Sequence, residues 1–203
     1  MNSRGYKEEV KRRVRGVSAG TVFVLTDFAD IASPDTVRQT LKALVDECTI
    51  ERILPGVFFK PKMSAVLGEP VPPHPDDVAH AVARAKNWSI APGGQVALNA
   101  LGLSTQVPMT WTYVSDGPYA TYSIKGAELR FKRSKNRDTT GLSETTSIVI
   151  QALKALGKDA VGDKEIAVIS KRLSDDEKLA LLREAERATA WVREAIRRIC
   201  DEA

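Results

Sequence analysis

The stretch from residue 33 to residue 61 constrains the fold of this 203-residue chain more than any other part of the sequence. It begins SPDTVRQTLKALVDEC and ends TIERILPGVFFKP. Ser33 predicts a helix N-cap, because a serine hydroxyl can accept a free backbone N–H, and Pro34 suits the first helical position. A Pro-Gly pair between two β-rich runs predicts a turn. We therefore expect a helix over 34–48 and a hairpin over 49–61.

The expected helix is amphipathic. Its apolar residues recur at helical spacing and predict a buried stripe made of Val37, Leu41, Leu44, Val45 and Cys48. The opposite face is polar and carries Asp35, Thr36, Arg38, Gln39, Lys42 and Asp46. On most helices such a face meets only water, so its meaning depends on the elements around it.

The preceding residues supply those elements. Residues 3–15 predict a charged helix that ends at Gly16, TVFVLT (21–26) predicts a strand, and DFADIA (27–32) predicts a short helix with Asp27 as N-cap. Helix, strand, short helix, helix and hairpin is the order of a winged helix-turn-helix. In that motif the second helix of the pair enters the major groove of DNA, and the hairpin contacts the duplex beside it.

This motif gives the polar face a predicted role in binding double-stranded DNA. Arginine commonly reads guanine and glutamine reads adenine, while lysine suits guanine or phosphate. We expect Arg38, Gln39 and Lys42 to reach base edges, with Ser33 and Thr36 completing the contact surface of the helix. The predicted phosphate contacts are Lys7, Lys11, Arg12, Arg52, Lys60 and Lys62. Two copies on paired DNA repeats are expected, and docking of a protein on the same face is the alternative.

Basic residues are concentrated in two places, although the net charge is only +4. Residues 1–20 hold six basic residues against two acidic ones. The run RFKRSKNR holds the second group, Arg130, Lys132, Arg133, Lys135 and Arg137. Both groups suit contact with a polyanion. The second could extend a DNA footprint or face an RNA-modifying partner protein or the RNA substrate of that partner, and the sequence leaves this open.

A proline-rich stretch, GEPVPPHPDD (68–77), predicts a domain boundary. We expect a DNA-binding domain over 1–66 and an α+β domain over 67–203. The second domain is predicted to contain a helix over 76–87, a short strand and a helix within 88–108, and an antiparallel meander. Its strands are expected over 109–117, 119–126 and 127–134, with turns at Asp116–Gly117 and Gly126. Helices are expected over 143–156, 162–172 and 174–200, the last opened by a capping box.

The sequence offers little catalytic chemistry. APGGQ (91–95) lacks the spacing of known phosphate-binding loops, and His74 and His80 lie without a carboxylate pattern for a metal. Cys48 and Cys200 are far apart in sequence. We therefore expect a protein that is not an enzyme and that needs no metal or cofactor. Three amide side chains in the apolar passage after APGGQ are expected to stabilise the following turn, with ligand binding as the alternative: Gln95, Asn99 and Gln106.

Membrane insertion is not expected. No run approaches the roughly 18 apolar residues of a membrane-spanning helix, and the N-terminal charges are not followed by the apolar segment of a signal peptide. The sequence therefore predicts a cytoplasmic location.

Two passages together carry a family resemblance. VFVLTDFADIASPDTVRQTLKALVDECTIERILPGVFFKP and IAPGGQVALNALGLSTQVP, followed by WTYVSDG, resemble the AbiEi-type antitoxins, and in particular their shorter branch. The resemblance extends from about residue 5 to residue 199, and ALNALGLSTQVP is its most specific part. By position, the recognition helix is 34–48.

The resemblance implies the antitoxin half of a two-gene toxin–antitoxin operon, of the kind linked to phage defence by abortive infection. The N-terminal winged helix would bind repeats upstream of the operon and repress it. The C-terminal domain would counter a nucleotidyltransferase-like toxin, and direct contact with that toxin varies within the family. Two alternatives stay open: a transcription regulator whose second domain senses a small molecule, and a nucleotide-handling enzyme built on APGGQ.

Overall fold

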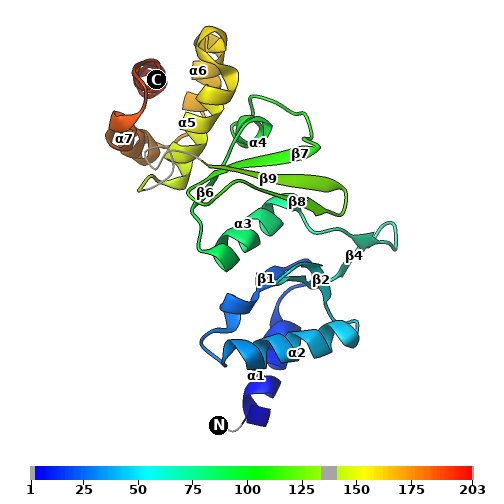
Figure 1. The fold of residues 1–203 in the computed structure, drawn as a ribbon. Coiled ribbons are helices and arrows are strands. Elements are labelled where there is room, and N and C mark those ends of the chain that lie inside the picture. Colours follow the sequence, from blue (N-terminus) through cyan, green and yellow to red (C-terminus); the bar gives the residue numbers. More distant parts are fainter. Residues whose placement is uncertain (1–2, 134–140, 203) are drawn as a thin grey trace. The chain divides into compact units, whose positions relative to one another are not determined.

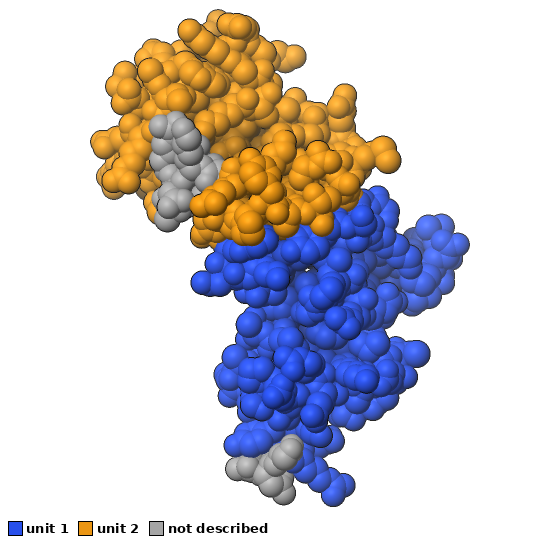
Figure 2. All heavy atoms as spheres, in the orientation of Figure 1, with its two compact units in different colours: residues 1–88, 122–127 blue, residues 89–121, 128–203 orange. Residues whose placement is uncertain are grey.

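A computed structural model of the chain describes residues 3–133 and 141–202. It divides into two compact units, residues 1–88 with 122–127 and residues 89–121 with 128–203 (Figure 2). The described residues form eight α-helices and three small sheets, so the chain is of the α+β class. None of the described helices has the length and apolarity needed to span a membrane.

The first unit begins with the elements that precede and include the sequence 33–61. They are the helix α1 (Ser3–Gly16), the strand β1 (Val22–Val24), the 3-10 helix η1 (Leu25–Phe28), the helix α2 (Pro34–Asp46), and the strands β2 (Glu51–Leu54) and β3 (Val57–Phe59) (Figure 1). The three strands form an antiparallel sheet in the order β1-β3-β2. The predicted helix and the predicted hairpin are therefore both present.

A core of apolar side chains lies between α1, α2 and this sheet. Phe23 of β1 stacks on Phe58 of β3 with 6.1 Å between ring centroids, and meets Phe28 edge-on at 5.7 Å. The helices complete the core with Val10, Val14, Val37, Leu41 and Leu44. Burial of one face of α2 fixes which of its residues point outward.

Two local predictions around α2 are wrong. The helix ends at Asp46, and Cys48 is exposed with a left-handed φ of 54°, because the chain turns there into β2. Asp27 is not an N-cap but the third residue of η1, where its Oδ2 accepts the Val24 N–H at 2.9 Å. The carboxylate still caps the short helix, from inside its first turn.

The predicted boundary at residues 66 and 67 falls inside the first unit. The strands β4 (Lys62–Met63) and β5 (Pro70–Val71) pair with each other, and the helix α3 (Pro75–Lys86) packs against β1, β3 and η1. Buried Val78, Ala81 and Val82 make α3 part of this unit. The prolines therefore start a strand and a helix of the first unit.

The strands of the second unit do not form the predicted meander. They are β6 (Ile90–Pro92), β7 (Thr110–Ser115) and β9 (Ala127–Arg133), and with β8 (Ala120–Ile124) their order is β6-β7-β9-β8. β7 pairs with β9 in parallel, with Tyr113 opposite Phe131. The Asp-Gly pair does not make a hairpin turn, since β7 and β8 are not neighbours in the sheet, and the Asp116 carboxylate accepts the Ser89 N–H at 2.9 Å beside β6.

Helices supply the core of the second unit. They are α4 (Gln95–Ala100), α5 (Glu144–Leu156), α6 (Asp163–Ser170), α7 (Asp175–Glu184) and α8 (Ala190–Asp201), with short 3-10 turns η3 (Lys158–Ala160) and η4 (Ala185–Arg187). The continuous helix predicted over 174–200 is wrong. It breaks at η4, and α8 packs against α7 so that Leu181 and Ile196 are both buried. The capping box of Ser174 and Glu177 is confirmed.

Candidate nucleic-acid interface

A hollow of about 430 Å³ lies between α2 and the β2–β3 hairpin. Its walls carry three basic side chains, Arg38 and Lys42 from α2 and Arg52 from β2. The remaining lining residues are Leu25, Val45, Asp46, Gly56 and Phe58. The fold therefore brings Arg52 to the same site as two cations on a separate helix.

The position of Arg38 and Lys42 follows from the amphipathic pattern of α2. They are four residues apart, so they lie on one face of the helix, and both are exposed. Gln39 is also exposed, beside Arg38. The buried residues Val37 and Leu41 hold the opposite face in the core. The helix thus presents the polar face that the sequence predicts.

The hydroxyl groups at the start of α2 have a capping role. Ser33 Oγ accepts the Thr36 N–H at 3.4 Å and lies 3.1 Å from Thr36 Oγ1. Neither residue lines the hollow. Their positions explain how the helix starts, and their predicted DNA contacts remain predictions.

The three cations of the hollow differ in their partners. Arg38 Nη1 lies 2.5 Å from Asp35 Oδ1, and both side chains are largely exposed, at 62% and 82%. Exposed pairs of this kind contribute little net stability, so a polyanion can replace Asp35 at low cost. Within the described ranges, no ion pair joins Lys42 or Arg52 to a carboxylate.

The hairpin turn shapes the other wall of the hollow. Gly56 has a φ of +80°, which only glycine adopts readily, and a Cβ there would meet open space. The strand register shifts between Arg52 and Leu54, opposite Phe58 and Val57. A bulge re-aims neighbouring side chains, and this one lies directly beside Arg52.

The basic residues of α1 do not join this hollow. Lys11 Nζ lies 3.2 Å from Glu47 Oε1, and thereby ties α1 to the residue that follows α2. Arg12 pairs with Glu9 at 2.5 Å on α1 itself. Lys7 is half-buried. Within the described part of the chain, none of these three side chains lines the hollow that contains Arg38.

Lys60 has a structural role that no local sequence pattern indicates. Its ammonium donates to the carbonyl oxygens of Val14 at 3.2 Å and of Arg15 and Val17 at 2.7 Å. An ammonium has three protons, and these carbonyls take all of them. The phosphate contact predicted for Lys60 is therefore replaced by capping of the C-terminal end of α1.

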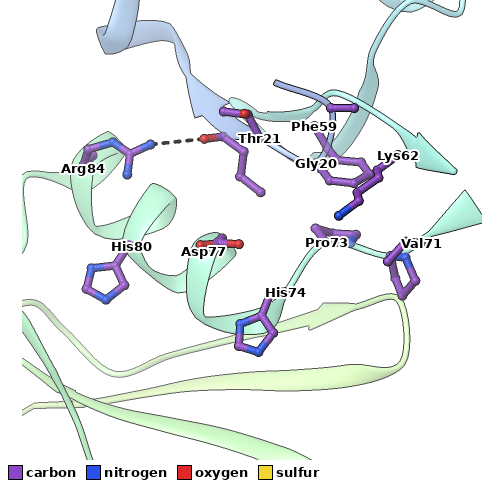
Figure 3. A pocket seen from close by; sticks show the side chains of 13 residues that line it. Gly20, Thr21, Phe59, Lys62, Val71, Pro73, His74, Asp77, His80 and Arg84 are labelled. Atoms are coloured by element: carbon purple, nitrogen blue, oxygen red, sulfur yellow. Dashed lines mark hydrogen bonds between the residues drawn. The ribbon is translucent and has the colours of Figure 1, made fainter. Parts of the chain in front are cut away.

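Lys62 lines a different hollow, of about 510 Å³, with Asp77 and Arg84 among its other lining residues (Figure 3). The Lys62 side chain packs over Gly20. A Cβ added at Gly20 would lie 3.4 Å from the Cδ atom of Lys62. Arg84 is already engaged, because its guanidinium donates to both Asp27 carboxylate oxygens at 3.2 Å and to the Val22 carbonyl at 3.4 Å. This contact spans 57 residues, and no local pattern in the sequence predicts it.

The second basic group is only partly described. Arg130 and Lys132 are exposed on one face of β9, and Arg133 is exposed on the other. Arg130 pairs with Glu128 at 2.7 Å. Lys135 and Arg137 lie outside the described residues.

Two of the three amide side chains predicted to stabilise the turn after α4, those of Gln95 and Asn99, form hydrogen bonds within it. Gln95 Nε2 donates to Asn99 Oδ1 at 2.9 Å and also to Ser104 Oγ, while Asn99 Nδ2 donates to the Gln106 carbonyl at 2.6 Å. Gln106 takes part through its backbone. Among the described residues, no cluster of histidine, cysteine and carboxylate side chains is placed to hold a metal ion.

Comparison with known proteins identifies the family. A model of the family of unknown function DUF6088 matches residues 9–181, and the chain belongs to that family. The chain is also similar to the Rv2827c protein of Mycobacterium tuberculosis, known from a crystal structure. The two are 14% identical with a TM-score of 0.45, over 95% of this chain and 74% of that one. This likeness is too distant to inform the site. No curated protein matches the sequence.

Proposed function

We propose that the first unit contains a winged helix-turn-helix and binds double-stranded DNA through α2 and the β2–β3 hairpin. The observation that carries the proposal is the convergence of Arg38, Lys42 and Arg52 on one hollow between these elements. The element order and the strand order β1-β3-β2 support it. In this arrangement α2 is the helix that enters the major groove.

Each element has a distinct task in this proposal. Arg38 and Gln39 contact base edges, because their side chains offer two hydrogen-bonding groups to guanine and adenine respectively. Lys42 contacts guanine or phosphate. Arg52, on the hairpin, contacts the backbone, which positions the protein without reading sequence. A single module reads a short site, so two copies would bind paired repeats.

We further propose that the protein is a cytoplasmic antitoxin that represses its own operon and is not itself an enzyme. This part rests on the resemblance to the AbiEi-type antitoxins. The second unit would counteract a nucleotidyltransferase-like toxin encoded beside it. The hydrogen bonds that Gln95 and Asn99 make within the turn favour a structural role for it over ligand sensing.

A reporter experiment tests the regulatory part of the proposal. The DNA upstream of the native operon drives a reporter gene, and the full chain is supplied from a separate promoter. We expect the wild-type chain to repress the reporter and the variant R38A/K42A to lose most of the repression at equal protein level. Equal repression by both chains would refute the proposed role of α2.

A further inference from the structure

A groove of about 380 Å³ lies between α7 and α8 of the second unit. Its lining residues are Leu182, Ala185, Glu186, Arg193, Ile196 and Arg197. Ala185 and Ile196 are buried and form an apolar floor, at 3% and 1% exposure. The groove is thus open, but its base belongs to the protein core.

Leucine side chains on α7 extend this apolar surface into solvent. Leu182 is 41% exposed and Leu179 is 51% exposed. They are three residues apart and therefore lie on one face of α7. Burial of two exposed leucines beside an apolar floor is favourable, because a partner that covers them removes apolar surface from water.

The opposite wall of the groove is basic. Arg193 and Arg197 are four residues apart on α8, so they form one row along the groove. Arg193 donates to the backbone carbonyl of Glu186 at 3.3 Å. Within the described part of the chain, no carboxylate forms an ion pair with Arg193. Arg197 lies 3.6 Å from Glu194, and both of these side chains are about two-thirds exposed, at 67% and 65%. Among the described residues, Glu186 is the one acidic residue that lines the groove.

We propose that this groove binds an amphipathic helix of a partner protein. The partner's apolar ridge would pack on Leu179 and Leu182, and acidic residues flanking that ridge would pair with Arg193 and Arg197. The inference rests on the proposed antitoxin function, because the partner it names is the toxin of the same operon. It adds to that function a direct contact and its location.

The surface chemistry favours a protein helix over a nucleic acid. Phosphate contacts need cations and hydrogen-bond donors, whereas exposed leucines over an apolar floor contribute nothing to them. A groove between two packed helices accepts a third helix, whose anchors recur every three or four residues. α7 has ten residues, or about 15 Å of length, which accommodates roughly three turns of such a helix.

Charge reversal of the arginine row tests the groove. The product of the gene adjacent in the operon is expressed from an inducible promoter, together with full-length wild-type chain, the variant R193E/R197E, or the control K164E/K171E. The control makes the same change in net charge at two exposed lysines at α6. Growth is scored, and affinity for the purified gene product is measured by isothermal titration calorimetry.

We expect the wild-type and control chains to restore growth and to bind alike, and the groove variant to bind on the order of tenfold or more weakly. Circular dichroism checks that the variants fold. If R193E/R197E does not fold, L182Q, at a side chain already partly in water, replaces it and should also weaken binding. Equal binding by a folded groove variant and by the control would overturn the inference.

Two further outcomes separate this inference from the proposed function. If the wild-type chain restores growth but does not bind the gene product, the antitoxin function stands and the groove contact is wrong. If the gene product is harmless, or toxic and not countered by the wild-type chain, the antitoxin function fails and the inference fails with it. Loss of RNA or DNA binding by R193E/R197E, with toxin binding unchanged, would assign the row to nucleic acid instead.

Discussion

The ammonium of Lys60 lies 2.7 Å from the carbonyl oxygen of Arg15, across 45 residues of sequence. Together with its bonds to Val14 and Val17, this contact places a positive charge at the C-terminal end of α1. Carbonyl groups in the last turn of a helix have no partner within the helix, and the helix dipole is negative there. Lys60 therefore joins the end of β3 to the end of α1.

Replacement of Lys60 should reduce stability and should not act through DNA. We expect K60A to lower the free energy of unfolding by about 1–3 kcal/mol, since hydrogen bonds from a charged donor are lost at a partly buried site. Urea denaturation measures this change. The matched control is K62A, two residues on, which should change stability by less than about 0.5 kcal/mol. Equal effects of the two variants would contradict the capping role.

The Asp27 carboxylate should be a second stabilising centre of the first unit. It accepts hydrogen bonds from the Val24 N–H and from the Arg84 guanidinium. We expect D27A to cost about 1–3 kcal/mol in the free energy of unfolding, because a backbone N–H and a guanidinium both lose their acceptor. D77A removes an exposed carboxylate from α3 and should cost less than about 1 kcal/mol. Thermal or urea unfolding of both variants would show whether the difference is present.

Asn99 should hold the turn after α4. Its amide donates to the Gln106 carbonyl and accepts from Gln95. We expect N99A to cost about 1–2 kcal/mol and to speed amide hydrogen exchange over residues 101–108. The control is Q106A, because within the described residues only the backbone of Gln106 takes part in this network. If N99A exchanges no faster than Q106A, the amide does not hold the turn.

Acid should destabilise the second unit through two glutamates. The Ser174 backbone N–H, followed by the hydroxyls of Thr145 and Ser174, lowers the pKa of Glu177 below its usual value of 4.5. Partial burial raises the pKa of Glu184, but hydrogen bonds from Thr146 and Ser143 outweigh it and leave that pKa lowered. A lowered pKa in the folded state stabilises the protein above the pKa of the unfolded chain. This contribution is lost as the pH falls through the folded value.

The variant E177Q tests this pH dependence. Glutamine can keep the capping geometry without titrating, so the wild-type chain should be the more stable of the two at pH 7. The difference should shrink as the pH falls from about 5 to about 3. E186Q, at an exposed glutamate of η4, should follow the wild-type curve. A difference between E177Q and wild type that stays constant with pH would contradict the account.

Local sequence patterns predicted most of the first unit correctly. The Ser33–Pro34 start, the apolar spacing of Val37, Leu41 and Leu44, and the Pro55–Gly56 turn each act over a few residues, so the sequence shows them directly. The same local rules predicted that Arg38, Gln39 and Lys42 would be exposed. That Arg38 and Lys42 share a hollow with Arg52 depends on how α2 packs against the hairpin.

The errors have a common physical origin in contacts between distant residues. Asp116–Gly117 has the composition of a hairpin turn, but Asp116 accepts the N–H of Ser89, and β9 takes the place beside β7. Residues 174–200 keep helical spacing throughout, yet the chain breaks at η4 because α8 buries Val192 and Ile196. The sequence around Lys60 does not distinguish it from a surface cation, because its three carbonyl acceptors lie more than 40 residues away in the chain.

The most direct test of the central claim is the affinity of the full chain for DNA, measured by fluorescence anisotropy. Two duplexes are compared, one carrying the repeat upstream of the operon and one with that sequence scrambled. We predict that R38A weakens binding to the repeat by about 1–3 kcal/mol and hardly changes binding to the scrambled duplex. R52A should weaken both alike and reduce the salt slope by about one, and K86A, at the end of α3, should change neither. Equal loss on both duplexes for R38A, or no loss for R38A and R52A, would contradict the assignment of α2 and the hairpin as the DNA-binding surface.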